Sequence, residues 1–298
     1  MNAPLPGDGI RPATIAFLGP PGTHSEEAVR SALGDAGDKV VLVSAETNRE
    51  VVLAVEQGVA DAAFVAIENS VEGAVTETLD ALVHETPETL IVGELVWPVH
   101  HCLIAAEQVE AEKISTVASH PQALAQCSGY ITERLAGAER VQVASTSEAV
   151  RDAVVRADGH AAIGSRIAAE RYGGVVIDSE IEDVVGNRTR FVWLAKQQLD
   201  AGWLGTEPQA THKTSVVFSG FNDTSPGALV SILSEFAYRS VNLSKIESRP
   251  ERTQLGNYLF FVDLDGSTSE ERVADAIEAI RDKVKTIRVL GSFPAHEV

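Results

Sequence analysis

Four segments of the sequence place polar side chains where a β-rich run gives way to a turn or a helix. The first is FLGPPGTHSEEAV at 17–29, which passes through a Gly/Pro turn into a predicted helix start. Backbone N–H groups are free at a helix start and the helix dipole is positive there, so the turn could bind a carboxylate or a phosphate. The Lys that follows the glycines of a Walker loop is missing. By itself, the segment favours an ordinary strand-to-helix turn.

The second segment is VAIENSVEGAVTETLD at 65–80, in which Glu68, Asn69 and Ser70 follow a predicted buried strand at 62–66. Ligands usually bind beyond the carboxyl ends of strands in an open α/β sheet, so these side chains are candidates for a site. A turn followed by a helix cap uses Asn and Ser in the same way, and this structural role is an equal alternative.

The third segment is SHPQALAQC at 119–127, again at a strand-to-helix junction. Ser119 would lie at the strand end, and Gln122 and Gln126 would share one helix face because they are four positions apart. His120 could act as a general acid or base near neutral pH, although a lone His is more often structural.

The fourth segment is VVGNRTRFVWLA at 184–195, where a Gly-Asn turn leads Arg188, Thr189 and Arg190 into the start of an apolar strand. A hydroxyl beside guanidinium groups can hold carboxylates and handle a proton. These residues alone favour a simpler interpretation, in which a β-favouring Thr lies between two solvated arginines.

The elements that must position these segments follow an alternating pattern. From Thr14 to about Ala195, β-rich runs alternate with helical patterns, which predicts an α/β fold with a largely parallel sheet. Three helix starts have the capping-box spacing of a hydroxyl residue followed three positions later by Glu, namely Thr23 to Glu26, Thr47 to Glu50 and Ser145 to Glu148. The predicted strands are 14–18, 39–43, 62–66, 115–119, 141–145, 161–164, 175–177 and 190–195.

Residues 196–212 lose this periodicity and are interpreted as a linker, and residues 1–13 as an N-terminal tail. A second domain at 213–298 has the predicted order strand, helix, strand, strand, helix, strand. This βαββαβ order is that of the ferredoxin-like split unit. The predicted elements are 213–220, 226–239, 241–249, 257–265, 269–283 and 286–293.

Composition excludes several classes of function. The 298 residues carry a formal net charge of −19, which disfavours nucleic acid or an anionic membrane surface as a partner. The N-terminus has neither a basic start nor an apolar core, so we expect no signal peptide and a cytoplasmic protein. Cys102 and Cys127 are interpreted as small buried apolar residues. The adjacent His100 and His101 would point to opposite faces of a strand, which disfavours a shared metal ion.

Taken in order, the motifs GPPGTHSEEAV, IENSVEGAVTETLD, SHPQALAQC, STSEA and NRTRF resemble those of the prephenate dehydratase family. The second domain resembles the phenylalanine-binding ACT domain that follows the catalytic part in that family. This second resemblance rests on two runs, Gly227-Ala228-Leu229-Val230 and Glu247-Ser248-Arg249-Pro250. Two positions depart from the family pattern, because His24 stands where Phe is common and Ala66 where Pro is common.

The resemblance implies a two-lobed catalytic domain at 14–195 that is similar to periplasmic binding proteins, with the chain crossing between lobes near 97–102 and 183–190. It also implies conversion of prephenate to phenylpyruvate, water and carbon dioxide, without a metal or redox cofactor. The implied catalytic residues are Thr189 as hydrogen-bond donor or relay, with Asn69, Ser119 and Gln126 as neighbours and Glu68 as a second proton source if burial raises its pKa. The implied substrate-binding residues are Gly22, Thr23, Ser70, Thr146, Arg190 and Phe191.

For the second domain, the resemblance implies phenylalanine as an allosteric ligand at the two quoted runs and a homodimer or homotetramer. Two alternatives stay open, namely an enzyme that uses arogenate and a non-enzymatic amino-acid sensor on the same two-lobed fold. We expect no separate chorismate mutase segment, because no helical segment of that kind precedes Thr14.

Overall fold

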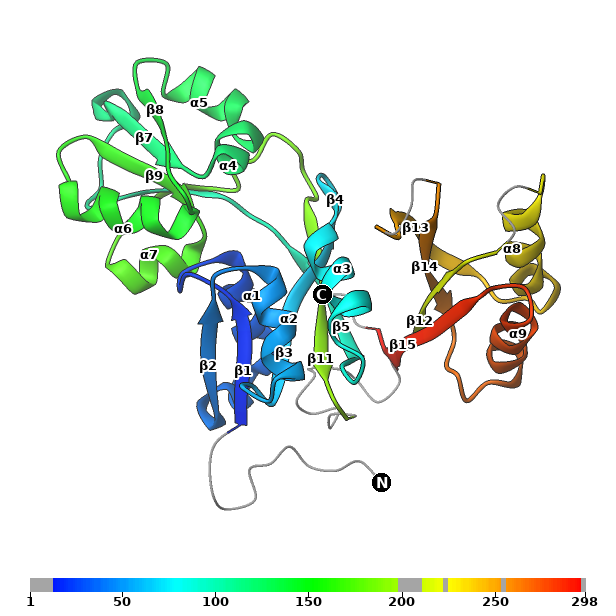
Figure 1. Cartoon of the computed structure of the whole chain (residues 1–298). Coiled ribbons are helices and arrows are strands. Elements are labelled where there is room, and N and C mark those ends of the chain that lie inside the picture. Colours follow the sequence, from blue (N-terminus) through cyan, green and yellow to red (C-terminus); the bar gives the residue numbers. More distant parts are fainter. Residues whose placement is uncertain (1–12, 198–210, 222–224, 253–255, 296–298) are drawn as a thin grey trace.

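The computed structural model describes residues 13–197, 211–221, 225–252 and 256–295. Residues 1–12 of the predicted N-terminal tail and most of the predicted linker lie outside these ranges, whereas Ala13, predicted to end the tail, begins the first strand. The described chain forms two α/β lobes and a C-terminal domain that packs beside the first lobe (Figure 1). Within the described residues, no helix is long and apolar enough to cross a membrane.

Lobe one is built on a mixed sheet with the strand order β2-β1-β3-β11-β5 and the short β4 added to β3. Strand β1 runs parallel to β2 and β3, whereas β11 runs antiparallel to both β3 and β5. The strands are β1 (Ala13–Leu18), β2 (Val40–Ala45), β3 (Ala62–Asn69), β4 (Gly73–Ala74), β5 (Leu90–Pro98) and β11 (Arg188–Ala195), and the helical elements are α1 (His24–Leu33), η1 (Gly34–Lys39), α2 (Asn48–Glu56) and α3 (Thr76–His84).

Lobe two has the strand order β10-β6-β9-β7-β8, in which β6 is antiparallel to both neighbours. Its strands are β6 (Cys102–Ala105), β7 (Thr116–Ser119), β8 (Glu139–Gln142), β9 (His160–Gly164) and β10 (Val175–Ser179). Its helical elements are η2 (Ala111–Lys113), α4 (Pro121–Gln126), α5 (Ser128–Arg134), α6 (Thr146–Arg156) and α7 (Arg166–Tyr172). The chain enters this lobe through residues 99–101 and leaves it through 180–187.

The predicted α/β alternation is confirmed, but the sheets are less parallel than expected. Strands β5 and β6 were not predicted, although they carry the chain from one lobe to the other. The β5 sequence LIVGELVWP contains Glu94, which is 1% exposed, and a carboxylate in the middle of a run is an argument against a buried strand. Strand β8 ends at Gln142, three residues before the predicted end.

The three predicted helix caps are confirmed. The hydroxyl groups of Thr23, Thr47 and Ser145 accept hydrogen bonds from the backbone N–H groups three residues later. In a capping box the Glu carboxylate accepts a hydrogen bond from the backbone N–H of the capping residue. At the first cap, the residue before Thr23 provides this N–H group instead. There the carboxylate of Glu26 accepts from the backbone N–H of Gly22 at 2.6 Å. This bond holds the Gly/Pro turn against the start of α1.

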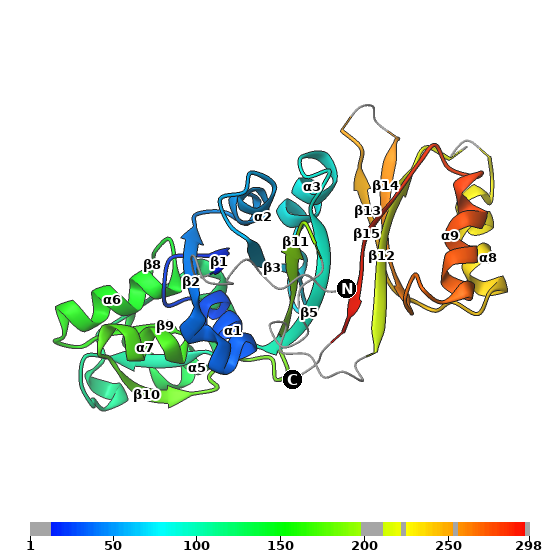
Figure 2. The ribbon, with the colours of Figure 1, turned by 90° about the horizontal axis from the view of Figure 1, so that it is seen from below.

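The C-terminal domain has the predicted βαββαβ order and an antiparallel sheet in the order β13-β14-β12-β15. Helices α8 and α9 cover one face of this sheet, and the other face meets lobe one (Figure 2). The elements are β12 (His212–Ser219), α8 (Ala228–Tyr238), β13 (Leu243–Pro250), β14 (Tyr258–Asp265), α9 (Glu271–Arg281) and β15 (Thr286–Pro294).

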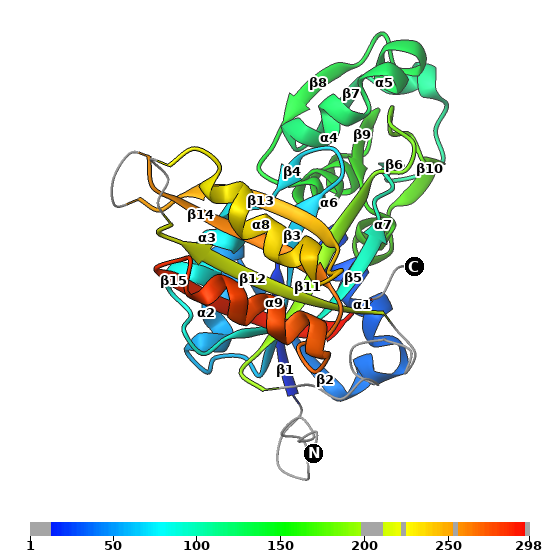
Figure 3. The ribbon, with the colours of Figure 1, turned by 90° about the vertical axis from the view of Figure 1, so that its right-hand side faces the viewer.

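Apolar side chains join the C-terminal sheet to lobe one in a single core. Phe261, Leu290 and Phe293 belong to the same buried cluster as Leu82 and Ile91 of lobe one. Burying a Leu or Phe side chain contributes about 1.5–3 kcal/mol, so a contact of this kind holds the two units together firmly. Figure 3 shows the C-terminal sheet lying across β11 and β5.

Gly291 of β15 packs directly against the backbone of β5, because a Cβ atom there would lie 1.9 Å from the backbone oxygen of Ile91. We expect Gly291→Ala to lower the melting temperature by about 5 °C or more, since the two backbones must move apart. Gly137→Ala is the matched control, because a Cβ atom at Gly137 meets nothing within 4 Å. Equal melting temperatures for the two variants would contradict the packing described here.

Candidate active-site cleft

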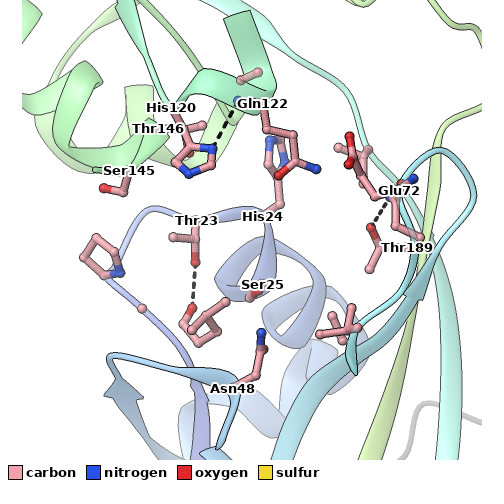
Figure 4. A pocket seen from close by; sticks show the side chains of 18 of the residues that line it. Thr23, His24, Ser25, Asn48, Glu72, His120, Gln122, Ser145, Thr146 and Thr189 are labelled. Carbon is pink, nitrogen blue, oxygen red and sulfur yellow. Dashed lines mark hydrogen bonds between the residues drawn. The ribbon is translucent and has the colours of Figure 1, made fainter. Parts of the chain in front are cut away.

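A cleft opens between the two lobes, and both lobes supply its polar lining (Figure 4). Lobe one contributes the Gly/Pro turn, the start of α1, the β3–β4 turn and the start of β11. Lobe two contributes the starts of α4 and α6, and residues from both crossing segments complete the wall. The polar residues lining the cleft include Thr23, His24, Asn48, Asn69, Glu72, His101, His120, Gln122, Gln126, Ser145, Thr146, Asn187 and Thr189.

Thr189 and Asn69 face each other across the antiparallel pair β11 and β3. The side-chain amide of Asn69 donates to the Thr189 hydroxyl oxygen at 2.9 Å and to the Asn187 side-chain oxygen at 2.9 Å. Its own oxygen accepts from the backbone N–H groups of Val71 and Glu72, which fixes the orientation of the amide. Because Thr189 accepts from Asn69, the hydroxyl hydrogen of Thr189 is left free to be donated to a ligand.

Gln126 connects lobe two to this pair. Its Nε2 donates to the Glu72 carboxylate at 3.2 Å, and since a carboxylate only accepts, Gln126 Oε1 is the acceptor end. Gln126 Oε1 accepts from Nδ2 of Asn187 at 3.3 Å and lies 2.9 Å from Nε2 of His101. One network therefore runs from the lobe-two helix α4 through both crossing segments to Thr189.

His101 is held as a neutral imidazole in this network. Its Nε2 must carry the hydrogen that Gln126 accepts, so Nδ1 is a bare acceptor. The side chain is 4% exposed, and Nδ1 has no protein partner. Burial, together with the neighbouring His24, lowers the pKa of His101 to about 4, because a buried imidazolium loses its hydration.

Helix starts supply the positive character of the cleft. Residues at or next to the starts of α1, α2 and α6 line it, namely Thr23, Asn48 and Thr146. Free N–H groups and the helix dipole favour an anion at such positions. The cleft-lining residues include no Lys or Arg among those that the structure describes. A negatively charged ligand would therefore depend on backbone N–H groups, hydroxyls, amides and imidazoles.

The structure brings together many of the residues singled out from the sequence. Thr189, Asn69, Gln126, Thr23, Thr146 and Phe191 all line the cleft. Ser70, expected to bind substrate, is exposed and outside the cleft lining, and its hydroxyl oxygen accepts from the backbone N–H of Arg188 at 2.9 Å. The backbone oxygen of Gly22 accepts from the buried hydroxyl of Ser165 at 2.8 Å, so this glycine joins the two lobes.

Arg190 is a correction to the sequence analysis, which expected it to grip a substrate carboxylate. Successive residues of a strand point to opposite faces, so Arg190 points away from the cleft that Thr189 faces. The side chain is buried at 9% exposure, with Nε 2.6 Å from Glu94 and Nη1 2.5 Å from Asp263 of the C-terminal domain. Burial opposes its charge, but Asp263 and Glu94 raise the pKa of Arg190 above its ordinary value.

Glu68 and Ser119 also lie outside the cleft lining, contrary to expectation. Glu68 pairs with Lys245 of the C-terminal domain at 2.8 Å, on the same face of the sheet as Arg190. Ser119 is fully buried, and its hydroxyl donates to the backbone oxygen of Ile163 at 2.6 Å. Both had been placed beside Thr189 because they end or follow strands, but the direction of the side chain decides the contact.

Six charged residues form what we call the interface ion cluster. Lobe one contributes Glu68, Glu94 and Arg190, and the C-terminal domain contributes Lys213, Lys245 and Asp263. Lys213 lies 2.6 Å from the Glu94 carboxylate, which Arg190 also contacts. The three acids and three bases balance, which is the condition under which charges are tolerated in a buried contact.

The two runs of the C-terminal domain that resemble a phenylalanine site are placed separately. Gly227 precedes α8 with a φ of 82°, a left-handed conformation that favours glycine, and residues 228–230 form the first turn. In β13, Ser248 pairs with Phe260 on the helix-covered face of the sheet. Arg249 faces lobe one, where its guanidinium lies 3.0 Å from Asp80 of α3. Arg249 therefore makes a contact between the two domains, which the sequence did not indicate.

Three residues of the cleft network were not proposed as site residues from the sequence. These are Glu72, His101 and Asn187. Glu72 and Asn187 lie within quoted motifs, where Asn187 was assigned to the Gly-Asn turn, and His101 was considered only as a metal ligand. For His101 and Asn187, a position inside the predicted crossing segments was the available signal, whereas nothing in the sequence distinguished Glu72. Among the described residues, no group of three or more His, Cys, Asp or Glu side chains is arranged to hold a metal ion.

A two-lobed α/β fold with a polar cleft between the lobes is common to enzymes and binding proteins, and comparison with known proteins narrows the class. A family model for prephenate dehydratase matches residues 15–199. The prephenate dehydratase of Amycolatopsis methanolica is 40% identical over 279 residues, which cover 94% of this chain and 88% of that protein. The bifunctional chorismate mutase/prephenate dehydratase of Neisseria gonorrhoeae is 35% identical and is covered to 75% of its length. The chain therefore belongs to the prephenate dehydratase family.

Two solved prephenate dehydratases agree with this assignment, and a third similar structure is described as an acylase. Prephenate dehydratase from Arthrobacter aurescens, in complex with L-Phe, has a TM-score of 0.82 and 36% identity, covering 94% of this chain and 90% of that one. Prephenate dehydratase from Staphylococcus aureus has a TM-score of 0.77 and 30% identity, covering 94% and 99%. GqqA, described as a novel type of quorum quenching acylase, has a TM-score of 0.79 and 29% identity, covering 95% and 98%.

The low pKa of His101 gives a pH-dependent stability. A histidine with a pKa of about 4 in the folded chain and about 6.5 in the unfolded chain contributes stability above pH 6.5 that is lost as the pH falls through 4. We expect the free energy of unfolding of the wild type, measured relative to that of His101→Gln, to fall by about 3 kcal/mol from pH 7 to pH 4. The variant has no titrating group at this position. Gln keeps a donor toward Gln126. Urea unfolding at several pH values measures the difference, and a constant value would contradict the assignment.

Proposed function

We propose that this chain converts prephenate to phenylpyruvate, water and carbon dioxide. The observation that carries the proposal is the Asn69–Thr189 pair, which leaves a hydroxyl hydrogen free in a cleft lined by helix starts. Membership of the prephenate dehydratase family supports the same reaction.

The reaction needs little covalent chemistry from the protein. The bond between the ring and its carboxylate breaks, the released electron pair makes the ring aromatic, and the ring hydroxyl leaves. A proton or a strong hydrogen bond must reach that hydroxyl for it to depart as water, and general acid help of this kind contributes roughly 10²–10⁴-fold. Thr189 donates this hydrogen bond. Because a Thr hydroxyl is a weak acid, its role is that of a donor or relay supported by Asn69.

Substrate carboxylates bind at the helix starts in this proposal. Prephenate carries two carboxylates, and the starts of α1 and α6 present Thr23 and Thr146 from opposite lobes. Binding across both lobes would hold the ring between them and keep it in register with Thr189. Phe191, two residues along the same strand, lies in the same wall, but it is 2% exposed and stacks on Phe64, so it supports the wall from behind.

The acylase among the structural relatives calls for a comparison of chemistry. Acyl transfer by a serine or threonine needs a hydroxyl that is hydrogen-bonded to a base, usually a His. In the described part of the cleft, His101 is bonded to Gln126 and His120 to the backbone N–H of Gln122. No hydroxyl is paired with an imidazole in that described part. The geometry supports dehydration over acyl transfer.

Replacing Thr189 tests the proposed chemistry. We expect Thr189→Val to lower kcat for prephenate by roughly 10²–10⁴-fold, because the shape is kept and the donor is lost. Thr189→Ser is the matched control and should stay within about tenfold of wild type, since it keeps the hydroxyl. Phenylpyruvate formation is the readout, together with an unchanged melting temperature. Near-normal turnover by folded Thr189→Val would rule out a threonine-centred mechanism.

We further propose that the C-terminal domain is an ACT domain that binds phenylalanine and inhibits turnover. The βαββαβ topology, the Gly227-Ala228-Leu229-Val230 turn and the neighbouring Ser248 and Pro250 support this assignment. The Arthrobacter aurescens relative was solved in complex with L-Phe. Homodimer or homotetramer formation goes with this proposal, and it is supported by exposed apolar side chains on α8, β13 and β14, namely Val230, Tyr238, Ile246 and Tyr258.

The interface ion cluster offers a route from the C-terminal domain to the cleft. Arg190 is the chain neighbour of Thr189, and Glu68 is the neighbour of Asn69. A shift of the C-terminal sheet would move Asp263 and Lys245, which hold Arg190 and Glu68. Phenylalanine inhibits in this account by favouring a sheet position that tilts the Asn69–Thr189 pair.

Lys245→Met tests this route, because it removes one charge of the cluster, keeps the aliphatic stem and leaves Glu68 half-exposed to water. We expect the phenylalanine concentration for half-inhibition to rise about fivefold or more. Lys113→Met is the matched control, because Lys113 pairs with Glu110 at the exposed surface of lobe two. Equal phenylalanine sensitivity in wild type and both variants would contradict the coupling, whereas weaker inhibition in Lys245→Met alone supports it.

A further inference from the structure

The cleft has an unusual balance of charge for an anionic substrate. Glu46, Glu72 and Glu148 line it, and the described lining contains no Lys or Arg. Histidines are the remaining side chains there that can carry a positive charge, namely His24, His101 and His120. The protein as a whole is also strongly acidic, so each donor in the cleft acts against an unfavourable background field.

His24 is the histidine whose nitrogens are free. It is the first residue of α1, and its side chain is 17% exposed and directed into the cleft (Figure 4). Neither Nδ1 nor Nε2 has a hydrogen-bond partner in the protein. Nδ1 lies 3.5 Å from Glu27 Oε2, beyond the usual hydrogen-bond range. Buried polar atoms are nearly always satisfied, so two free nitrogens at a cleft wall indicate a ligand group.

The other two histidines are already committed. His120 caps α4 by accepting from the backbone N–H of Gln122. His101 donates to Gln126 and stays neutral, with Nδ1 able only to accept. Its ring lies edge-on to that of His24, with centroids 5.1 Å apart and an interplanar angle of 81°. This contact fixes the plane of His24 without using either of its nitrogens.

We propose that His24 is a specificity-determining residue that donates a ring N–H to a carboxylate of the substrate, and this rests on the proposed function. An imidazole carries an N–H in its neutral form and two when charged, so a donor is present in either state. The ring stands at the start of α1, where backbone N–H groups and the helix dipole favour the same carboxylate.

His24→Phe tests whether His24 acts as a hydrogen-bond donor or only fills space. Phe keeps the edge contact to His101 and removes both nitrogens. We expect the KM for prephenate to rise about tenfold and kcat to stay within about threefold, which is the signature of a lost binding contact. His24→Asn, which restores an N–H group, should recover part of the loss. His84→Phe, at the exposed end of α3, is the matched control and should behave as wild type.

The outcomes separate this inference from the proposed function. If the wild-type chain does not turn over prephenate, the proposed function fails and the inference about His24, which rests on it, is overturned with it. If wild type is active and His24→Phe has an equal or lower KM, His24 only fills space and the inference is overturned. A fall in kcat at constant KM overturns it as well, since that result places His24 in the chemical step. Calorimetric titration of prephenate into Thr189→Val, with and without His24→Phe, should show the same tenfold loss of affinity.

Discussion

The antiparallel pairing of β3 with β11 determines where every important side chain of this protein lies. Thr189 stands opposite Asn69, and Arg190 stands opposite Glu68. Because neighbouring residues of a strand point to opposite faces, the first pair faces the cleft and the second faces the C-terminal domain. A shift of one residue in register would exchange the two pairs, placing a guanidinium in the cleft and a hydroxyl in the domain contact. The proposed catalytic pair and the proposed route of regulation thus depend on a single register.

The contact between lobe one and the C-terminal domain combines two kinds of interaction with different consequences. Apolar packing around Phe261 and Phe293 supplies the attraction. The interface ion cluster adds little net stability, because desolvation of buried charges offsets their attraction. The ion cluster nevertheless fixes how the C-terminal sheet is aligned on lobe one, because displacing Asp263 would leave Arg190 buried without one of its partners. An element of this kind is suited to transmit a change of position between domains.

Much of the fold could be predicted from local sequence signals. The hydroxyl caps of α1, α2 and α6 and the βαββαβ order of the C-terminal domain follow from spacing that acts within a few residues. Strand β5 could not be predicted in this way, because its buried Glu94 is explained only by Arg190 and Lys213, which are distant in sequence. The largely parallel sheet was also wrong, because the chain returns from lobe two through β11, which runs opposite to its neighbours.

Some residues of the candidate site were predicted and others were not, again because contacts between distant segments cannot be seen in the sequence. Thr189, Asn69 and Gln126 were found, but Arg190 and Glu68 were grouped with them although alternation along a strand separates them. Nothing in residues 184–195 shows that a second domain covers the far face of the sheet. The role of His101 depends on Gln126 and His24, which come from other elements. Contacts between distant segments, then, limited the prediction of the site more than that of the fold.

The central claim is that Thr189 faces the substrate while Arg190 faces the C-terminal domain. A crystal structure of the full chain carrying Thr189→Val, grown with prephenate, tests this claim most directly. The account predicts the ring hydroxyl next to the side chain of residue 189, the carboxylates at the starts of α1 and α6, and Arg190 still held by Glu94 and Asp263. Prephenate bound away from residue 189, or the Arg190 guanidinium turned into the cleft to hold a carboxylate, would contradict it.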